Sequence, residues 1–321
     1  MDTYLVTGCA GFIGFNFIKK MLIEGKNIIG IDNLNNYYNP KLKKKRLNIL
    51  KRYKKFIFKK IDIADYNKLY NFINQKNINV IVHLAAQAGV RYSLQNPWAY
   101  ESSNNLGTLN VFECARNCNI KKVVFASSAS VYGDLNSSWC EYKKTAPISL
   151  YAATKLYNEN LAYAYNHLYN IDFVGLRFFS AYGEYGRPDM ALWIFAKNIL
   201  EDKPIDVYNF GNMKRDFSYI DDIVSGISEA IKYNKSSFEI FNLSSGGSIT
   251  LKKYIQLIEK HIGKNAKINY LPLQAGDILK SEANLQKSNK LLRYYPKTNI
   301  DVGVNKFIKW YLENWNWIKD L

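Results

Sequence analysis

The start of the chain reads as a strand, a glycine-rich turn, a helix and a second strand that ends in an acid. Residues 3–7 are apolar, and Thr7-Gly-Cys-Ala-Gly-Phe-Ile-Gly14 opens a helix expected to reach about Glu24. The second strand, Asn27–Ile31, is followed by Asp32. A strand, turn, helix and strand in this order form the βαβ unit that binds dinucleotides, and it fixes the start of a parallel sheet.

Each part of this unit has an expected task. Gly8 permits the tight turn, Gly11 lets a pyrophosphate approach the free N–H groups at the helix N-terminus, and Gly14 lets the helix pack closely. Asp32 is placed to accept hydrogen bonds from a ribose 2′-hydroxyl, and no Arg follows it directly. The pattern therefore predicts an NAD site rather than an NADP site.

The alternation of strands and helices continues to residue 178. Together with the first two strands, the pattern predicts six strands and a doubly wound parallel sheet of the α/β class. The further strands are expected at 55–61, 79–84, 121–127 and 172–178, and the further helices at 66–75, 97–118 and 151–169. We expect an NAD-binding domain over 1–178, a returning segment at about 216–243 with an extra strand at 238–242, and a smaller, mainly substrate-binding α/β domain over 179–321.

Two stretches bring reactive side chains to the same edge of this sheet. Ser128 comes at the end of the fifth strand, and Tyr151 and Lys155 stand one turn apart on the next helix. A nearby ammonium lowers the pKa of a phenol, which would make Tyr151 a general base. Ser128 could hydrogen-bond a substrate hydroxyl and relay a proton.

Composition leaves several classes of partner to consider. The net charge of +17 allows nucleic-acid binding through the basic stretches 43–46 and 51–55, but no nucleic-acid motif accompanies them, so we interpret them as a solvated helix face. The four cysteines form no CxxC pair or Cys/His cluster, which argues against a metal site. No signal peptide or membrane-length apolar run is evident, so we expect a cytoplasmic enzyme without membrane or nucleic-acid partners.

With these motifs in order, the chain resembles the extended short-chain dehydrogenase/reductase superfamily. Within it, the chain is similar to the NAD-dependent nucleotide-sugar epimerases, and most closely to the UDP-glucuronate 4-epimerase family. The resemblance covers nearly the whole chain and rests on Ile31-Asp-Asn-Leu-Asn-Asn-Tyr-Tyr38, Ala85-Ala-Gln-Ala-Gly-Val-Arg-Tyr-Ser93, Tyr151-Ala-Ala-Thr-Lys155, Gly186-Arg-Pro-Asp-Met-Ala191 and Asp206-Val-Tyr-Asn-Phe-Gly211 through Asp222.

The resemblance implies three sets of site residues. The catalytic set is Ser128, Tyr151 and Lys155. The cofactor set is Gly8, Gly11, Phe12, Ile13, Gly14, Asp32, Asn33, Asp62, Ile63, Leu84, Ala85, Ala86, Asn104, Tyr151, Lys155 and Phe178. The substrate set is Arg91, Ser128, Ser130, Tyr151, Ser180, Arg187, Arg215 and Asp277, with Arg215 and Asp277 on the UDP moiety and Arg187 facing the sugar carboxylate.

The implied reaction inverts C4 of a UDP-hexuronic acid through a 4-keto sugar, using NAD. A bidentate Arg187 could stop the β-keto acid from decarboxylating by fixing the C5–C6 bond; the alternative is an ordinary surface ion pair with Asp189 or Glu184. Near the sugar, Ser180-Ala181 and Glu184-Tyr185 depart from the residues usual in the family.

The same residues are compatible with three other functions. The first is a UDP-glucose/UDP-galactose 4-epimerase. The second is a 4,6-dehydratase or UDP-uronate decarboxylase, which Ala129 and Ser130 argue against because those enzymes usually carry an acid there. The third is a non-catalytic NAD or nucleic-acid binder. The family commonly forms homodimers through the helices at about 98–118 and 150–169.

Overall fold

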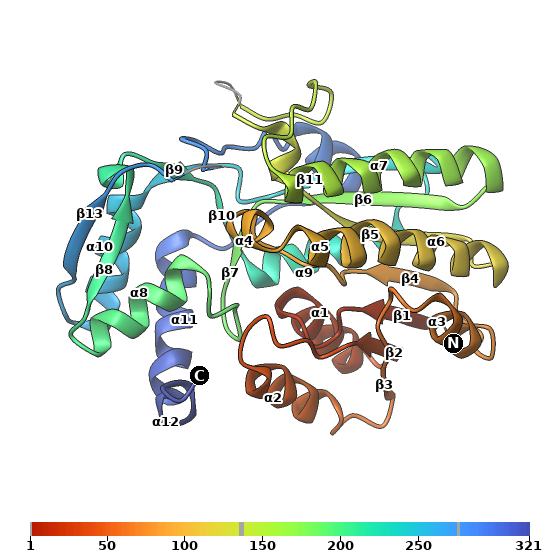
Figure 1. The fold of residues 1–321 in the computed structure, drawn as a ribbon, viewed down its shortest axis with the longest axis horizontal. Helices are drawn as coiled ribbons and strands as arrows, with labels where there is room; N and C mark the ends of the chain where they lie inside the picture. The colour runs from red at the N-terminus through yellow and green to blue at the C-terminus, as the bar shows by residue number, and fades with distance from the viewer. Residues whose placement is uncertain (1, 135–137, 275–276) are drawn as a thin grey trace.

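The computed structural model describes residues 2–134, 138–274 and 277–321, and its centre is a seven-stranded sheet (Figure 1). Every neighbouring pair in this sheet is parallel, which confirms the predicted doubly wound α/β fold. Across the sheet the strands are β11 (Phe238–Leu243), β6 (Asp172–Phe178), β5 (Lys122–Ser128), β4 (Val80–His83), β1 (Thr3–Thr7), β2 (Asn27–Asp32) and β3 (Phe56–Lys60). The seventh strand, β11, pairs with β6, where an extra strand was expected.

Helices cover both faces of this sheet. On one face lie α3 (Tyr66–Ile73), α6 (Gly107–Asn117) and α7 (Leu150–Tyr169), and on the other lie α1 (Phe12–Ile23), α2 (Pro40–Leu50) and α9 (Ile220–Lys232) (Figure 1). Successive strand residues point to opposite faces. Leu5 therefore packs in the core under α6 and Val6 in the core under α1, and both are fully buried. Burial on both faces explains why the strands are almost entirely apolar.

The helix expected over 97–118 is divided in the structure. It consists of α5 (Pro97–Tyr100), a π-helical segment at Glu101–Leu106 and α6, and it is preceded by a short helix, α4 (Val90–Gln95). Gly107 follows the π-helical segment and lies against Ile63, since a Cβ at Gly107 would come within 2.6 Å of the Ile63 Cδ1. Periodicity alone did not reveal this change of winding.

The C-terminal region forms a smaller layer of helices and short strands beside the sheet (Figure 1). Its short strands pair as β7 (Ser180–Tyr182) with β10 (Phe217–Tyr219), β8 (Pro204–Tyr208) with β13 (Lys267–Leu271), and β9 (Lys214–Arg215) with β12 (Ile249–Thr250). Its helices are α8 (Ala191–Leu200), α10 (Leu251–Ile262), α11 (Ile300–Glu313) and α12 (Trp315–Ile318). Short helical turns occupy Ala129–Tyr132, Asn209–Gly211 and Ser288–Leu292.

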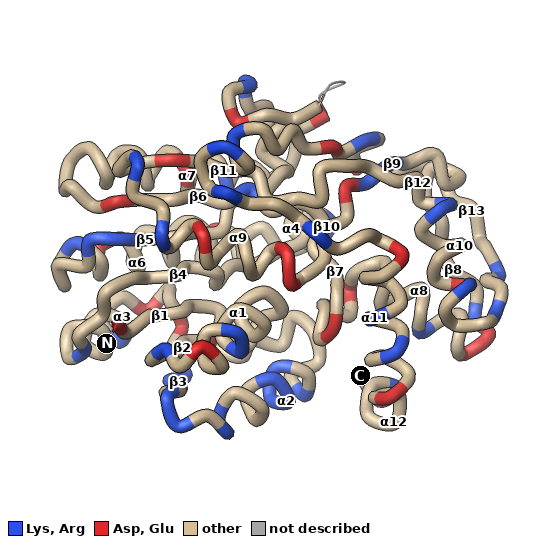
Figure 2. Tube along the Cα trace, turned by 180° about the vertical axis from the view of Figure 1, so that it is seen from behind, with Lys and Arg blue, Asp and Glu red and all other residues tan. Residues whose placement is uncertain are grey.

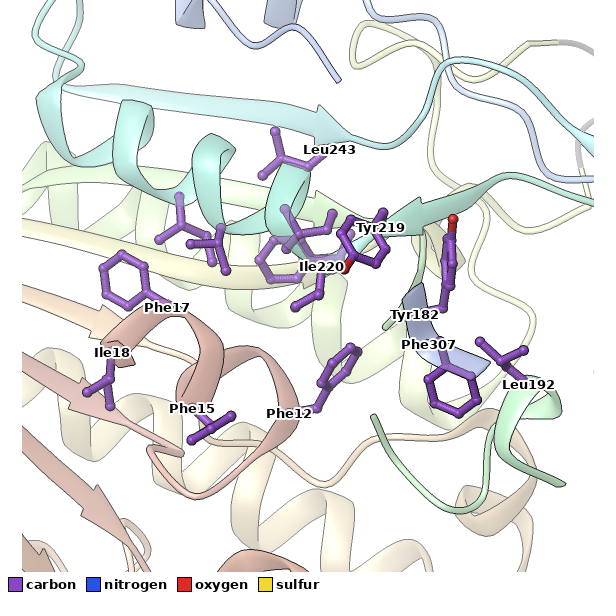
Figure 3. Close-up of a cluster of buried hydrophobic side chains, with 14 of the residues drawn as sticks. Phe12, Phe15, Phe17, Ile18, Tyr182, Leu192, Tyr219, Ile220, Leu243 and Phe307 are labelled. Atoms are coloured by element: carbon purple, nitrogen blue, oxygen red, sulfur yellow. The ribbon is translucent and has the colours of Figure 1, made fainter. Parts of the chain in front are cut away.

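One apolar core continues from the sheet into the C-terminal region. Figure 3 shows Phe12 and Phe17 of α1 on the side toward α9, with labelled side chains of β7, α8 and α11 extending the same cluster. The labelled members are Phe12, Phe15, Phe17, Ile18, Tyr182, Leu192, Tyr219, Ile220, Leu243 and Phe307. This packing fixes the C-terminal region over the carboxyl ends of the strands. Among the described helices, none has the length and apolar character needed to cross a membrane.

Candidate active site

A cavity of about 720 Å³ lies along the carboxyl ends of the parallel strands, where ligands bind in such sheets. The sheet and the C-terminal region both contribute to its walls. All the predicted site residues line it except Asp62 and Asn104. The lining set is Gly8, Gly11, Phe12, Ile13, Gly14, Asp32, Asn33, Ile63, Leu84, Ala85, Ala86, Arg91, Ser128, Ser130, Tyr151, Lys155, Phe178, Ser180, Arg187, Arg215 and Asp277.

The glycine turn is shaped to receive a diphosphate. Gly8 has φ +70°, and a Cβ there would lie 2.7 Å from the backbone nitrogen of Ala85. A Cβ at Gly14 would lie 2.3 Å from the carbonyl oxygen of Gly8. Helix α1 begins after Gly11 with no side-chain cap and no acidic residue in its first turn. Its first N–H groups therefore face the cavity edge without a competing anion, which fits the pyrophosphate of NAD.

The end of β2 forms the part of the cavity wall where the sequence predicts the adenosine half of a dinucleotide. The Asp32 carboxylate accepts hydrogen bonds from the backbone N–H of Ala10 at 3.0 Å and of Leu34 at 2.8 Å. Asn33 lines the cavity, and its amide donates to Asp62 at 3.0 Å. Asp62 lies behind Asn33 rather than in the wall. Its other oxygen caps the following turn by accepting from Ala64.

Asn104 was expected to line the cofactor site, and the structure places it outside the cavity lining, against the loop after β4. Its side chain is fully buried and does not reach the cavity. It accepts from the Gln87 backbone N–H at 2.8 Å and donates to the Gln87 carbonyl at 3.0 Å and to the Thr154 hydroxyl at 2.9 Å. Asn104 therefore joins the loop after β4 to helix α7, and it shapes the cavity only through that loop.

Ser128, Tyr151 and Lys155 come together at the end of β5. Helix α7 is capped by Ser149, whose hydroxyl accepts from Ala152 N–H at 3.2 Å, and this places Tyr151 and Lys155 in the first turns of the helix. The Lys155 ammonium donates to the Ala126 carbonyl at 3.0 Å. Burial lowers the pKa of Lys155 to about 8.

The ionisation of Tyr151 differs from the expectation. Burial raises the pKa of its phenol, while a hydrogen bond with Ser128 and the charge of Arg187 act in the opposite direction. The expected lowering by Lys155 is not the governing effect, because the ammonium is directed to the Ala126 carbonyl in strand β5. The cation that does act on the phenol is Arg187, which sequence spacing could not show.

Arg187 lines the cavity as expected, and it is paired there with Asp189. Its Nε donates to Asp189 Oδ1 at 3.0 Å, and its Nη2 donates to Oδ2. Burial alone would raise the pKa of Asp189, but the charge and hydrogen bonds of Arg187 lower it below its usual value. The ion pair considered as the alternative for Arg187 is thus present, in the cavity wall. Glu184 does not take part, and it accepts instead from the Tyr219 hydroxyl at 2.9 and 2.7 Å.

Two further arginines lie at the end of the cavity near the C-terminal region. Arg91 forms an ion pair with Asp277 at 3.0 Å and covers the Tyr208 ring at 4.6 Å. Arg215 donates to the carbonyls of Lys214 and Leu279, and it makes no ion pair with the part of the chain that is described. Burial lowers the pKa of Arg215, with a smaller opposing effect from Asp277. A partly buried guanidinium without its own carboxylate suits an anionic group of a ligand.

The basic stretch on α2 was interpreted as a solvated face, and this is wrong for two of its residues. Figure 2 shows Lys and Arg gathered on α2, yet Arg46 is fully buried and Lys43 nearly so. Lys43 lines the cavity and donates to Asn35. The spacing of Lys43 and Arg46 on the same face as Leu47 is the signal that could have suggested burial.

Comparison with known proteins adds to this geometry. The model for the NAD dependent epimerase/dehydratase family matches residues 4–244. A UDP-glucuronate 4-epimerase of Thermodesulfobacterium geofontis is 42% identical, covering 100% of this chain and 99% of that protein. An uncharacterized protein of Methanocaldococcus jannaschii is 55% identical, covering 98% and 97%. A crystal structure of UDP-glucuronic acid 4-epimerase from Bacillus cereus in complex with UDP-glucuronic acid and NAD has a TM-score of 0.90 at 32% identity, covering 97% and 99%.

Proposed function

The chain belongs to the NAD dependent epimerase/dehydratase family, and from that premise we propose that it inverts C4 of UDP-glucuronate, giving UDP-galacturonate through a transient 4-keto sugar. The proposal is supported by relatives named for this activity at 42% identity and by a similar structure in complex with UDP-glucuronic acid and NAD. NAD, when bound, supplies the acceptor and donor of the C4 hydride. The uncapped start of α1 and the glycine turn fit its diphosphate.

The proton transfers fall to side chains at the end of β5 and the start of α7. Tyr151 takes the proton of the sugar 4-hydroxyl, either directly or through the Ser128 hydroxyl, and returns it after the sugar has turned. Ser128 also stabilises the ionised phenol by its hydrogen bond. Lys155, fixed to the Ala126 carbonyl, is placed to hold a ribose hydroxyl near the reacting centre.

A uronic acid is favoured over a neutral sugar by one observation. Arg187 lines the same cavity as Tyr151, close enough for its charge to oppose the burial that raises the pKa of the phenol. A guanidinium there can bind the C6 carboxylate and hold the C5–C6 bond away from alignment with the C4 carbonyl. In that orientation the β-keto acid keeps its carboxylate, because decarboxylation requires the breaking bond to overlap the carbonyl π system.

The sugar must turn between its two faces, so the other end of the substrate must stay bound. Arg215 lies at the far end of the cavity beside the Arg91–Asp277 pair. We assign Arg215 to the diphosphate and Asp277 to the ribose of the UDP moiety. This arrangement fixes the nucleotide and leaves the hexose free to rotate about its link to the diphosphate.

The test is product analysis by NMR. We expect purified protein to interconvert UDP-glucuronate and UDP-galacturonate without added NAD. A protein that converts UDP-glucose to UDP-galactose but leaves the uronate unchanged would be the neutral-sugar epimerase instead. UDP-pentose as the main product would identify a decarboxylase, which Ala129 and Ser130 argue against.

We also propose that the protein works as a cytoplasmic homodimer. Four free thiols are compatible with a reducing compartment. Helix α7 carries two charged residues, Lys155 and Glu159, and both are buried. Exposed apolar side chains lie along α7 and the helices beside it, and they include Trp98, Leu106, Tyr157 and Leu168. A charge-poor, apolar helix pair in a chain of net charge +17 has the composition of an interface core.

A further inference from the structure

Asp189 lies between two side chains of the cavity wall that come from distant parts of the chain. It accepts from Nε and Nη2 of Arg187, and its Oδ2 also accepts from the Tyr37 hydroxyl at 2.9 Å. Tyr37 belongs to the loop after β2, whereas Arg187 and Asp189 belong to the loop before α8. All three residues line the cavity. The three groups form a chain that runs from phenol to carboxylate to guanidinium.

The way Asp189 is bonded decides which edge of Arg187 can meet a ligand. The Nε–Nη2 edge of the guanidinium is occupied by the carboxylate. Nη1 donates no hydrogen bond to any described residue of the chain, and the side chain is 19% exposed. A planar guanidinium held by one edge has a fixed plane and a fixed direction for its other edge. The edge that contains Nη1 is therefore the one offered to a second carboxylate.

The surroundings hold Tyr37 in place. Its ring packs against that of Tyr92 at 4.7 Å. Gly89 has φ +106°, and a Cβ there would lie 3.1 Å from the Tyr37 hydroxyl and 3.4 Å from Arg187 Nη2. Burial, and then the charge of Asp189, raises the pKa of Tyr37 to about 12, so its hydroxyl stays a donor at neutral pH. The cluster is packed closely enough to restrict the rotamers of the Asp189 and Arg187 side chains.

We propose that Asp189, held by Tyr37, is a positioning residue that fixes the Arg187 guanidinium so that its Nη1 edge receives the C6 carboxylate of the sugar. This inference rests on the proposed function and concerns how the uronate is held. Asp189 then acts only through Arg187. Its loss frees the guanidinium to rotate, so that the C5–C6 bond can swing into alignment with the C4 carbonyl.

The test compares NAD-loaded wild type with Asp189→Ala, Arg187→Ala and the double variant. The expected result for Asp189→Ala is a fall in kcat with UDP-glucuronate of about tenfold, the size expected when a charge-assisted contact is misplaced. NMR should also detect UDP-pentose, the decarboxylated by-product, among the products. The affinity for UDP, which has no carboxylate, should not change. In the Arg187→Ala background, Asp189→Ala should alter neither kcat nor the pentose fraction by more than about twofold.

Two variants that each remove a single hydroxyl perturb folding less than Asp189→Ala does, so they test the positioning role separately from any folding defect. Tyr37→Phe removes the hydroxyl that holds Asp189. It should lower kcat less than Asp189→Ala does and should produce a smaller fraction of UDP-pentose. Tyr66→Phe is the matched control, because that hydroxyl accepts one hydrogen bond from Asn117 on the outer helices. A structural role alone would lower the melting temperature or NAD content of Asp189→Ala without producing pentose.

Three outcomes would overturn the proposal. Additive losses in the double variant would mean that Asp189 contacts the substrate itself. Tighter UDP-glucuronate binding with unchanged kcat and no pentose would mean that Asp189 competes with the substrate for Arg187. Pentose-free epimerisation at wild-type rate by both Asp189→Ala and Tyr37→Phe would remove the positioning role. By contrast, a wild-type protein that does not epimerise UDP-glucuronate would refute the proposed function before any variant is compared.

Discussion

His83 is held in its neutral form at the centre of the sheet. Its ring nitrogens are hydrogen-bonded to the hydroxyls of Thr7 at 2.7 Å and Thr108 at 3.0 Å. Burial lowers the pKa of His83 to about 3, and the charge of Lys155 acts in the same direction. A proton on this ring would place a second cation beside Lys155 in a dry interior. His83 is therefore a structural side chain whose charge the fold excludes.

This exclusion makes stability depend on pH. In the unfolded chain His83 takes up a proton below about pH 6.5, whereas in the folded protein it does so only near pH 3. The stability that depends on neutral His83 is fully present above pH 6.5. It is lost as pH falls toward 3, at about 1.4 kcal/mol per pH unit. We expect the free energy of unfolding in urea, compared between pH 7.5 and 5.5, to fall less in His83→Gln than in wild type. Exposed His167→Gln is the control, and an equal fall in His83→Gln would contradict the assignment.

At this scale the sequence predicted the positions that depend on local spacing. The glycines, Ser128, Tyr151 and Lys155 line the cavity as expected, because each is tied to the end of a strand or the turn of a helix. The contacts of Asn104 and Tyr37 were not predicted, because they join segments that lie far apart in the chain. Asn104 bonds Gln87 and Thr154, and nothing in the local sequence indicates which distant partner an amide will meet.

Among the helices, α2 is rich in Lys and Arg, and one of these residues connects two loops of the cavity wall. Arg46 is fully buried, and its guanidinium donates to the carbonyls of Ala10, Tyr185 and Gly186 and to the Tyr38 hydroxyl, at 2.6–3.0 Å. Ala10 belongs to the glycine turn, and Gly186 directly precedes Arg187. Arg46 therefore fastens the loop that carries Arg187 to the turn that receives the cofactor.

Replacing Arg46 should cost much more stability than replacing an exposed arginine beside it. Arg46→Met removes four hydrogen bonds and leaves buried carbonyls without donors, so we expect a loss of about 3 kcal/mol or more. Arg52→Met, exposed just after α2, should change stability by less than about 0.5 kcal/mol. Urea unfolding measures both, and amide hydrogen exchange at Gly186 and Arg187 should quicken only in Arg46→Met. Equal stabilities for the two variants would show that Arg46 is not the fastening residue.

Helix α2 also shows the limit of predicting from sequence which side chains of an element are buried. Sequence patterns placed α7 at its observed end and β6 at its observed bounds, because α7 has one buried face and β6 is a short apolar run buried along almost its whole length. They failed for Lys43 and Arg46, because a charged side chain is normally solvated unless backbone acceptors arrive from elsewhere. For Arg46, two of these acceptors are the carbonyls of Tyr185 and Gly186, about 140 residues further along the chain. Lys43 instead donates to Asn35 in the loop before α2. The π-helical segment before α6 was also missed, and Gly107, which directly follows it, packs against Ile63 from a distant part of the chain.

At the scale of the whole molecule, the net charge and the exposed apolar surface have opposite effects on the association of two copies of the chain. Each protomer carries a net charge of +17, so two copies repel one another at long range. The surface of α7 and its neighbouring helices exposes several apolar side chains and few charges, of which Glu101 lies near Tyr157, so contact there would remove mainly apolar area from water. The dimer proposed above would thus be held by a short-range attraction and opposed by a repulsion that salt can screen.

This balance predicts a dimer that becomes tighter as salt is added. Analytical ultracentrifugation should give twice the mass of the 37.1 kDa chain. Raising the ionic strength from about 0.02 to 0.3 M shortens the screening length from roughly 20 to 6 Å and should lower the dissociation constant. The variant Leu106→Glu/Tyr157→Glu should sediment as a monomer that still binds NAD, because both side chains lie outside the cavity. Ile23→Glu, exposed at the end of α1 on the other face of the sheet, should remain dimeric. A dimer that weakens with salt would instead indicate an interface built on ion pairs, and the apolar face of α7 would not be its core.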